Sequence, residues 1–436
     1  MTNKEGLLLK SIFQLKENGT TFKREVLAGL VSYLTAVYII AVNASILSDA
    51  GIPLEAGMIA TVLASFIGCL LMGLIGNTPI ILVPGMGVNA LFTYTICQSM
   101  GIPWQQGLAV VVISGVLFAV VSFTKLTELL TASIPSALKE AITVGIGIFL
   151  TFIGLQKAGL VQASETTFVQ LGDLTDPAVI ASILTLLVTI VLFARGVPGH
   201  FLISILAGTM IAFSFGLVKT GTSSESSGGF SSYTDVLGSI SFTGIADLAF
   251  WIGVFSLTMV IVFENVGLVH GHTAMIKRGD RFKRSLQANS ISAITSGFLG
   301  TSPTVSTVET AAGISAGGRT GLTAITTGLF FLASLLFLPY IKLIPDTAIA
   351  PILILIGGLM IQNIQNIDLQ DFSESFPAFL IIALIPLTYS IVDGMAFGFI
   401  AYPILKMAMK RSKEIAFPLY IIALLFLASM IFHSVH

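Results

Sequence analysis

The sequence predicts an all-α integral membrane protein that crosses the bilayer many times. Of its 436 residues, 55% are hydrophobic and only 10% are charged, whereas soluble domains carry about 25% charged residues. The mean hydropathy is +0.96. So few charges cannot cover a water-soluble surface, and the bilayer must therefore be the solvent. The net charge of −1 offers no basic surface to nucleic acid.

Fourteen apolar segments have the length of a membrane span, which needs about 20 mainly apolar residues. We expect these spans near residues 25–48, 55–75, 80–99, 105–124, 137–157, 178–196, 199–218, 249–269, 286–299, 301–317, 321–341, 346–363, 376–391 and 392–409. A further apolar stretch, 416–434, is either an additional span or a helix that lies along the membrane interface.

The distribution of Lys and Arg predicts the orientation, because these residues concentrate in cytoplasmic loops. The N-terminal segment 1–24 has no signal-peptide core and is rich in Lys, so we place it in the cytoplasm. With fourteen spans, the basic cluster at 277–284 also falls inside. The Ser/Gly-rich stretch 221–233 then becomes an external flexible loop between seven spans and seven more. We therefore expect a multi-pass protein of the cell membrane.

The third and tenth spans are predicted to be broken. Pro79 and Pro84 interrupt helical hydrogen bonding in the third span, and Pro303 does so in the Thr/Ser-rich tenth span. Each span then consists of an extended piece that leads into a half-helix. A pair of broken spans at matching places in two halves indicates a transporter's binding site, and an odd number of spans per half makes the repeats inverted. The alternative is that these prolines are ordinary kinks.

Nearly all acidic residues fall in loops or at span ends, but Glu264 and Glu309 lie inside spans. An acid at the centre of a membrane helix costs about 2.5–3.5 kcal/mol on insertion scales. We therefore expect both to face a polar cavity, although a purely structural hydrogen-bonding role is the alternative. A carboxyl group accepts N–H donors from a planar heterocycle and also carries a proton, and a proton-coupled importer needs both tasks.

Other polar and aromatic residues in the spans are each open to two interpretations, a role in the site or a structural role. Asn89 offers a donor and an acceptor that suit the mixed edge of a nucleobase, or it satisfies backbone freed by the neighbouring glycines. Phe92 and Tyr94 either stack on a ring or, as is commoner, pack against other spans. Asn43 either lines the site or, as we favour, binds a neighbouring helix.

Several further residues are not expected in the site. His270 and His272 lie beside the basic cluster and are expected at the interface, and Asp393 is expected to face outward. Cys69 and Cys97 stand in apolar runs, where we expect packing residues and neither a disulfide nor a metal site.

Two long motifs resemble a known family. PGMGVNALFTYTICQSMG (84–101) and GTSPTVSTVETAAGISAGGRTGLTA (300–324) are similar to signatures of the AzgA-like purine permeases, a branch of the nucleobase–cation symporters. The block at 386–402 and the first span, with Tyr38 and Asn43, are similar as well. The resemblance extends over most of the chain.

This resemblance implies the uracil-transporter architecture, in which fourteen spans form two inverted repeats of seven. It implies a core domain formed by residues 25–124 and 249–341. Residues 125–218 and 342–436 would form a gate domain that carries a homodimer contact, and 219–248 would be the external loop.

The resemblance also implies roles for single residues. Asn89 matches the Asn of the family's third-span motif, and Glu309 matches the Glu of its tenth-span motif. Glu264 stands where the family has Asp, in the run Phe263-Glu264-Asn265-Val266-Gly267.

The sequence departs from the family pattern near this site. Ile261 stands in place of a second Asp, Ala44 in place of Pro, and Asn265 in place of Thr. The longer Glu264 side chain is expected to shift or shrink the ligand position, which leaves the preferred base open.

We therefore expect proton-coupled symport of purine nucleobases, namely guanine or hypoxanthine and also adenine, into the cell by alternating access, without a cofactor or metal. The residues expected at the substrate are Glu264, Glu309, Asn89, Phe263, Gly87 and Val308, with Glu264 and Glu309 also carrying the proton. Alternatives are a transporter of uracil or xanthine, an anion transporter on the same fold, or a channel. A membrane enzyme is disfavoured, since neither H-E-x-x-H nor G-x-x-x-x-G-K-[ST] occurs.

Overall fold

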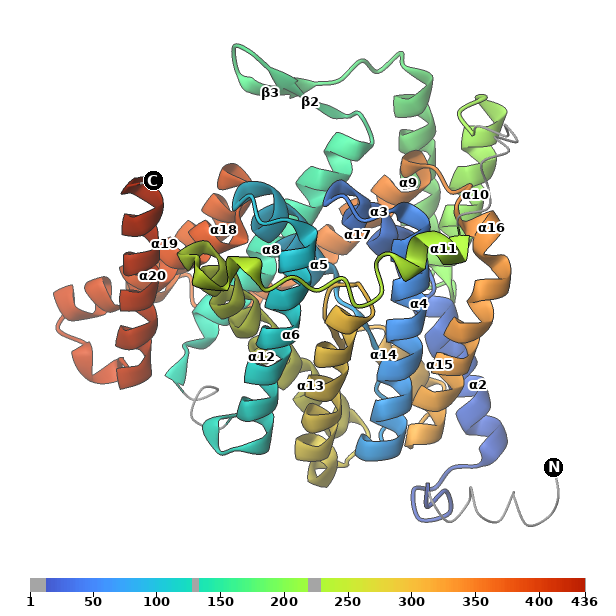
Figure 1. Ribbon diagram of the computed structural model, residues 1–436, viewed down its shortest axis with the longest axis horizontal. Coiled ribbons are helices and arrows are strands. Elements are labelled where there is room, and N and C mark those ends of the chain that lie inside the picture. The colour runs from blue at the N-terminus through green and yellow to red at the C-terminus, as the bar shows by residue number, and fades with distance from the viewer. Residues whose placement is uncertain (1–12, 128–132, 219–228, 436) are drawn as a thin grey trace.

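The computed structural model describes residues 13–127, 133–218 and 229–435, and most of them lie in helices (Figure 1). Within these residues, nine helices are long and apolar enough to cross a membrane, and three shorter apolar helices accompany them. The longer helices are α2 (Phe22–Ala36), α3 (Ile39–Asp49), α4 (Leu54–Leu71), α6 (Trp104–Phe123), α8 (Ser136–Lys157), α9 (Pro177–Ala194), α10 (His200–Ser214), α12 (Leu248–Met275), α13 (Phe282–Phe298), α15 (Gly321–Ala333), α17 (Asp346–Met360), α18 (Phe372–Thr388), α19 (Ile391–Ala408) and α20 (Phe417–Val435). Shorter helical pieces are η1 (Met72–Gly76), α11 (Gly229–Thr234), η3 (Thr243–Ala246), η4 (Gly279–Arg281), η5 (Ser334–Phe337), α16 (Leu338–Ile341), η6 (Ile361–Asn366) and η7 (Ser412–Glu414).

Every predicted span contains a helix, with two refinements. The first span, Phe22–Asp49, consists of α2 and α3, which join through Val37 and Tyr38, two residues that keep right-handed helical backbone angles. The stretch 416–434 forms α20, which packs against α19. That all fourteen segments cross the bilayer as two inverted repeats stays a prediction.

The helices pack in two groups. The first helix group contains α2, α3, α4, α6, α12, α13 and α15, in which α13 packs on α6 and α15 packs on α2 and α4. The second helix group contains α8, α9, α10, α17, α18 and α19, in which α17 packs on α8 and α18 on α19. The groups touch through a few pairs, namely α3 with α17 and α2 with α10.

The two broken spans meet between these groups. Strand β1 (Leu82–Pro84) pairs antiparallel with β4 (Thr304–Ser306), so that Val83 stands opposite Val305. As predicted, each extended piece leads into a helix: α5 (Met86–Ala90), continued by the π-helix η2 (Leu91–Ser99), and α14 (Thr310–Ser315). A Cβ on Gly85 would lie 2.3 Å from Cγ2 of Val305, so the close approach of the strands requires glycine there.

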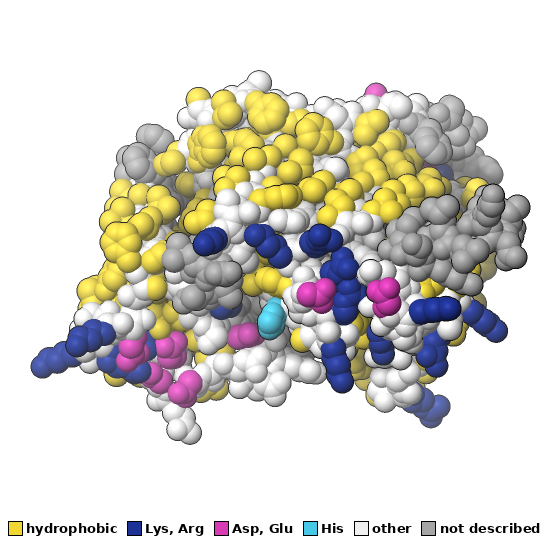
Figure 2. All heavy atoms as spheres, turned by 90° about the horizontal axis from the view of Figure 1, so that it is seen from below, with side chains coloured by type: hydrophobic (Ala, Val, Ile, Leu, Met, Phe, Trp, Pro, Cys, Tyr) yellow, Lys and Arg dark blue, Asp and Glu magenta, His cyan; other side chains and the backbone are white. Residues whose placement is uncertain are grey.

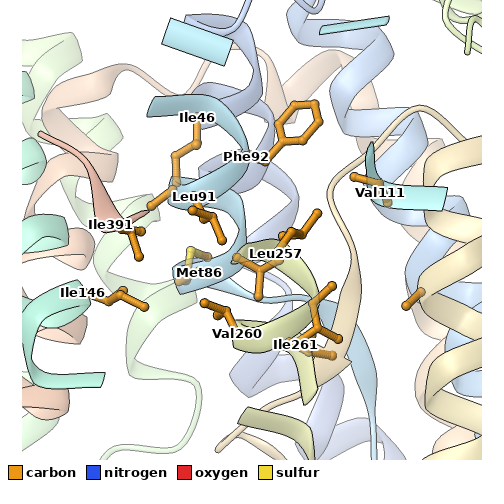
Figure 3. Packing of buried hydrophobic residues seen from close by; sticks show 14 of the residues in the cluster. Ile46, Met86, Leu91, Phe92, Val111, Ile146, Leu257, Val260, Ile261 and Ile391 are labelled. Carbon is orange, nitrogen blue, oxygen red and sulfur yellow. The ribbon is translucent and has the colours of Figure 1, made fainter. Parts of the chain in front are cut away.

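Apolar packing fixes α5 between the two groups (Figure 3). Met86 and Leu91 lie between Ile146 and Ile391 of the second group and Val260 of α12. All five side chains are buried. The half-helix of the third span is therefore held by apolar contacts on both sides.

Four short strands depart from the all-α prediction. Besides β1 and β4, strands β2 (Val161–Ser164) and β3 (Phe168–Leu171) form a hairpin that projects from the upper end in Figure 1. Prolines and glycines exclude a continuous helix in the broken spans, so their backbone groups pair with each other. The predicted loop 221–233 falls partly outside the described residues, and its last residues belong to helix α11.

Positive charge gathers at one end of the molecule. Figure 2, which views the lower end of Figure 1, shows Lys and Arg side chains together on this face. Lys277, Arg278 and Arg281 follow α12 there, close to the chain that leads into α2; for example, Arg278 donates a hydrogen bond to Asn18. Residues 13–24, the described part of the N-terminal segment, and the 277–284 cluster thus lie at the same end, and the orientation of this end in the membrane stays a prediction.

Candidate functional site

The candidate site lies where β1 and β4 pair and where α5 and α14 begin. Helix α12 packs against β4, α5 and α14 at this point. Residues from the third, eighth and tenth predicted spans therefore meet in one place, although up to 227 residues separate Leu82 from Glu309 in the chain. The backbone breaks and the intramembrane acids belong to the same structural feature.

Glu264 and Glu309 are both half-buried and face this place. Glu264 projects from α12 beside the start of α5, where a Cβ on Gly85 would lie 3.7 Å from its Oε1. Glu309 stands directly before α14, and its Oε1 accepts a 2.6 Å hydrogen bond from the hydroxyl of Tyr38. The two carboxyl groups lie near enough to interact electrostatically.

Asn89 is fully buried on α5 and is only partly satisfied. The Ser302 hydroxyl donates to its Oδ1, but its Nδ2 has no hydrogen-bond partner among the residues that the structure describes. A buried amide without a partner carries a desolvation cost. Asn89 therefore retains a free donor on the half-helix α5, whose start lies beside Glu264.

The remaining predicted site residues differ in their surroundings. Gly87 is buried, and a Cβ there would lie 3.1 Å from Ile146 of α8, so it faces the second helix group. Phe263 packs against the apolar interior. The Val308 side chain is 66% exposed. The structure thus brings Glu264 and Glu309 close to each other, and Asn89 lies on the half-helix α5 that begins beside Glu264.

The other candidates have structural partners. The Tyr94 hydroxyl donates to Asp49 at 2.7 Å, and Phe92 is fully buried in the apolar interior. Asn43 donates to the hydroxyls of Thr61 and Thr301, which ties α3 to α4 and to the chain before β4. These contacts agree with the packing alternatives.

A polar network next to β4 was not predicted from the sequence. Asn265 accepts the backbone N–H of Ser306 at 2.8 Å and an amide donor from Asn289. His272, which we expected at the interface, is instead buried, with Nδ1 3.1 Å from the Ser306 hydroxyl. Polar residues in the apolar stretch of α12 were the available signal. Together they hold β4 in place from the side opposite β1.

A third buried carboxylate, Glu25, was also missed. It is fully buried in the first turn of α2 and accepts the backbone N–H groups of Arg319, Thr320 and Thr323 at 3.0, 3.2 and 3.2 Å. The hydroxyls of Thr320 and Thr323 donate as well, at 2.9 and 2.6 Å. Glu25 therefore caps the N-terminus of α15 from another helix, away from the site.

The structure shows no arrangement typical of metal or hydrolase chemistry at this place. Within the described ranges, no three His, Cys, Asp or Glu side chains gather as metal ligands, and both cysteines are free. Residues 313–317 have the Gly-x-Ser-x-Gly spacing of a hydrolase elbow, but Ser315 ends helix α14 and does not join a strand to a helix.

Comparison with known proteins adds the family. The sequence model described as "Permease family" matches residues 23–430. The nucleobase transporter PlAzg2 of Paenibacillus larvae is 52% identical over 87% of this chain and 77% of that protein. The guanine/hypoxanthine permease PbuO of Bacillus subtilis is 38% identical over 95% and 98%, and the adenine permease AdeP of Escherichia coli is 35% identical over 98% and 97%.

Solved structures show the same fold at low identity. The transmembrane domain of a cyanobacterial bicarbonate transporter, BicA, superposes with a TM-score of 0.65 at 17% identity, covering 84% of this chain and 96% of that chain. SLC26A9 gives 0.65 at 13% identity, covering 94% and 70%. The family match over nearly the entire sequence and the shared transporter fold lead to one conclusion: the chain belongs to the permease family and is a transport protein, not an enzyme.

Proposed function

We propose that this permease imports purine nucleobases together with protons, by alternating access across the cell membrane. The substrate class is supported by relatives that are named as nucleobase, guanine/hypoxanthine and adenine permeases. Guanine or hypoxanthine is the expected substrate, with adenine as a further one.

The observation that carries the proposal is that Glu264 and Glu309 lie close together where the two broken spans pair, beside the half-helix that bears Asn89. Two carboxyl groups at membrane depth are costly, and a planar ligand with N–H donors would offset that cost. The unpartnered Asn89 amide supplies a donor for a ring nitrogen or an exocyclic oxygen. Phe263 would form a wall of the pocket. Gly87 and Val308 would contribute backbone groups to the proposed contacts.

The same two acids would bind the coupling proton. Two carboxyl groups that interact electrostatically favour a state in which one is protonated. Glu309 would hold one edge of the base, Glu264 would hold a second edge, and the coupling proton would be carried by this pair of acids. A neutralised site then crosses the membrane more readily than a doubly charged one.

We assign the movement to the two helix groups. The first helix group, with the half-helices, would be the core that carries substrate, and the second would be the gate that also forms a homodimer contact. The fourteen segments would be two inverted repeats, with the N-terminus and the basic face of Figure 2 in the cytoplasm.

The test is uptake of radiolabelled hypoxanthine, guanine, adenine, xanthine and uracil in cells that lack their own permeases. We expect saturable purine uptake that a protonophore abolishes. Glu309→Gln should reduce uptake on the order of 100-fold, since it removes a charge-assisted contact and the coupling proton. Glu55→Gln, at an exposed ion pair with Lys342, is the matched control and should transport normally.

Two results would overturn the proposal. Uptake of uracil or of bicarbonate in place of purines would reassign the substrate, and normal transport by Glu309→Gln would remove Glu309 from the site. BicA and SLC26A9 share this fold, but an anion in the proposed site would face two carboxyl groups. Their negative charge makes an anion a poor substrate.

A further inference from the structure

Tyr38 stands at an unusual position in the first predicted span. Helix α2 ends at Ala36 and α3 begins at Ile39, so Tyr38 lies in the two-residue turn that joins them, where the backbone stays right-handed helical. Its side chain is 2% exposed. A buried tyrosine needs a partner for its hydroxyl, and this one finds it in a site carboxylate from the other half of the chain.

The Tyr38 hydroxyl donates to Oε1 of Glu309 at 2.6 Å. This is the length of a charge-assisted hydrogen bond. The contact links residues 271 positions apart in sequence. It fixes one oxygen of Glu309 and leaves the other for a ligand or a proton.

The Tyr38 ring also reaches the second helix group. Its centroid lies 4.6 Å from that of Phe201, which is buried at the start of α10. Close to it, a Cβ on Gly199 would lie 3.6 Å from the carbonyl oxygen of Leu34 in α2. One side chain therefore touches both the site carboxylate and the helix group proposed to move against it.

We infer that Tyr38 is a positioning residue that sets the protonation behaviour of Glu309 and joins it to the proposed gate through Phe201. The inference rests on the proposed function, in which Glu309 holds the substrate and takes part with Glu264 in proton coupling. Tyr38 donates to ionised Glu309 and so favours that state. When Glu309 is protonated, its hydrogen bond from the Tyr38 hydroxyl loses its charge-assisted strength. The Tyr38 ring can then shift against Phe201.

Other titratable groups face Glu309 from the neighbouring elements. Glu264 approaches from α12. His200 approaches from α10, within electrostatic range of Glu309, and its Nε2 is buried without a hydrogen-bond partner in the described part of the chain. These groups contribute to the pH profile of the parent, so the test compares variants that leave both of them in place.

The test compares Tyr38→Phe with Tyr33→Phe. Both remove one buried or half-buried hydroxyl from neighbouring turns, and the Tyr33 hydroxyl pairs with Ser334 at 2.8 Å, away from the site. Uptake of radiolabelled hypoxanthine is measured between pH 5 and pH 8.5 in energised proteoliposomes. We expect Tyr38→Phe to move the alkaline limb of the profile upward by about one pH unit, the change for a lost charged hydrogen bond. Tyr33→Phe should follow the parent.

A third variant tests the contact with the gate. Phe201→Leu keeps the Tyr38 hydroxyl but removes the ring contact, so we expect a several-fold lower maximal rate with an unchanged pH profile. If Tyr38→Phe is too slow for uptake, protection of its melting temperature by hypoxanthine, measured over the same pH range, reports the same shift from binding alone.

The outcomes separate the two proposals. A parent that neither transports nor binds a purine refutes the proposed function. An active parent whose Tyr38→Phe variant has the same pH profile refutes the role of Tyr38 alone. A shift in both Tyr38→Phe and Tyr33→Phe would show a general structural effect and would also refute it.

Discussion

Lys157, the last residue of α8, lies with Nζ 2.9 Å from a carboxylate oxygen of Asp49, the last residue of α3. The Lys157 side chain is 15% exposed and also approaches Asp346 of α17 at 3.8 Å and the Ser45 hydroxyl at 3.3 Å. Tyr94 donates to Asp49 from η2. We call Lys157, Asp49, Asp346 and Ser45 the Lys157 cluster. It joins the two helix groups at the end opposite the basic face.

Neutralising Lys157 should loosen this end. In the variant Lys157→Met, two carboxylates lose their shared cation, and we expect a state in which the two helix groups separate at this end to gain population by about tenfold, or 1.4 kcal/mol. The partly exposed Cys97, on η2 next to Gln98, which donates to the backbone carbonyl of Asp49, reports this opening. In a Cys69→Ser background, a membrane-impermeant maleimide applied from outside should label Cys97 faster than in the parent.

The control for this experiment is Lys342→Met. Lys342 pairs with Glu55 at 2.8 Å, but both side chains are more exposed, at 38% and 31%. Exposed pairs contribute about 0–1 kcal/mol, so labelling should stay at the parental rate. Equal labelling of all three proteins would contradict a role for the Lys157 cluster in holding the groups together.

Asn89 and Asn43 should respond differently to replacement. Asn89→Ala removes an amide whose Nδ2 has no described partner and whose Oδ1 accepts one bond, from Ser302, so the melting temperature should fall only slightly. If the Nδ2 donor serves substrate, KM should rise about 10- to 100-fold, the range for one or two hydrogen bonds. Asn43→Ala removes two satisfied bonds to Thr61 and Thr301 and should lower the melting temperature more, without the rise in KM. Uptake kinetics and melting curves in detergent separate these effects, and a normal KM for Asn89→Ala would argue against substrate contact.

Glu25 is expected to be a stability residue without a transport role. Glu25→Ala deprives five donors of their acceptor, three of them backbone groups at the start of α15. We expect a loss of about 3–5 kcal/mol, the range for breaking buried charged contacts. Melting curves and yield of folded protein measure it, with Glu55→Ala as the exposed control. A variant as stable as the control would show that water replaces the carboxylate.

Asp371 gives a pH dependence outside the membrane segments. Hydrogen bonds from Ser373 and then Arg411 lower the pKa of Asp371 from 3.8 to about 2, with Ser373 Oγ at 2.7 Å and Arg411 Nη1 at 2.5 Å. A lowered folded-state pKa stabilises the protein above the unfolded value, and this contribution disappears as pH falls from about 4 towards 2. Asp371→Asn should therefore lower the melting temperature by a constant amount between pH 5 and pH 8.

The acid limb of this effect provides the check. The difference between parent and Asp371→Asn, followed by tryptophan fluorescence, should shrink below about pH 4. Ser373→Ala removes the largest cause of the lowered pKa, so its acid limb should start at higher pH than that of the parent. A difference that grows on acidification would have the wrong sign.

The positions of the helices and of the breaks followed from properties that are local in the chain. Apolar length marks a helix in a bilayer, because the backbone must satisfy its own hydrogen bonds there. Prolines at 79, 84 and 303 exclude such bonding, and the structure has an extended pair near the latter two. Glu264 and Glu309 stood out because a charge is costly among apolar neighbours. Glu25 did not stand out, because it lies at the end of a predicted span, where a charged side chain is expected to reach water. In the structure it is fully buried.

What the sequence by itself determined was the class of protein, the broken spans and the acids that need a polar place. Only the tertiary structure decided which partners they receive: Tyr38 for Glu309, Thr323 for Glu25 and Asp49 for Lys157. These partners lie about 100 to 300 positions apart, so no periodicity along one helix connects them. A hydrogen bond depends on distances of a few ångströms in space, and those are set by how the two helix groups pack.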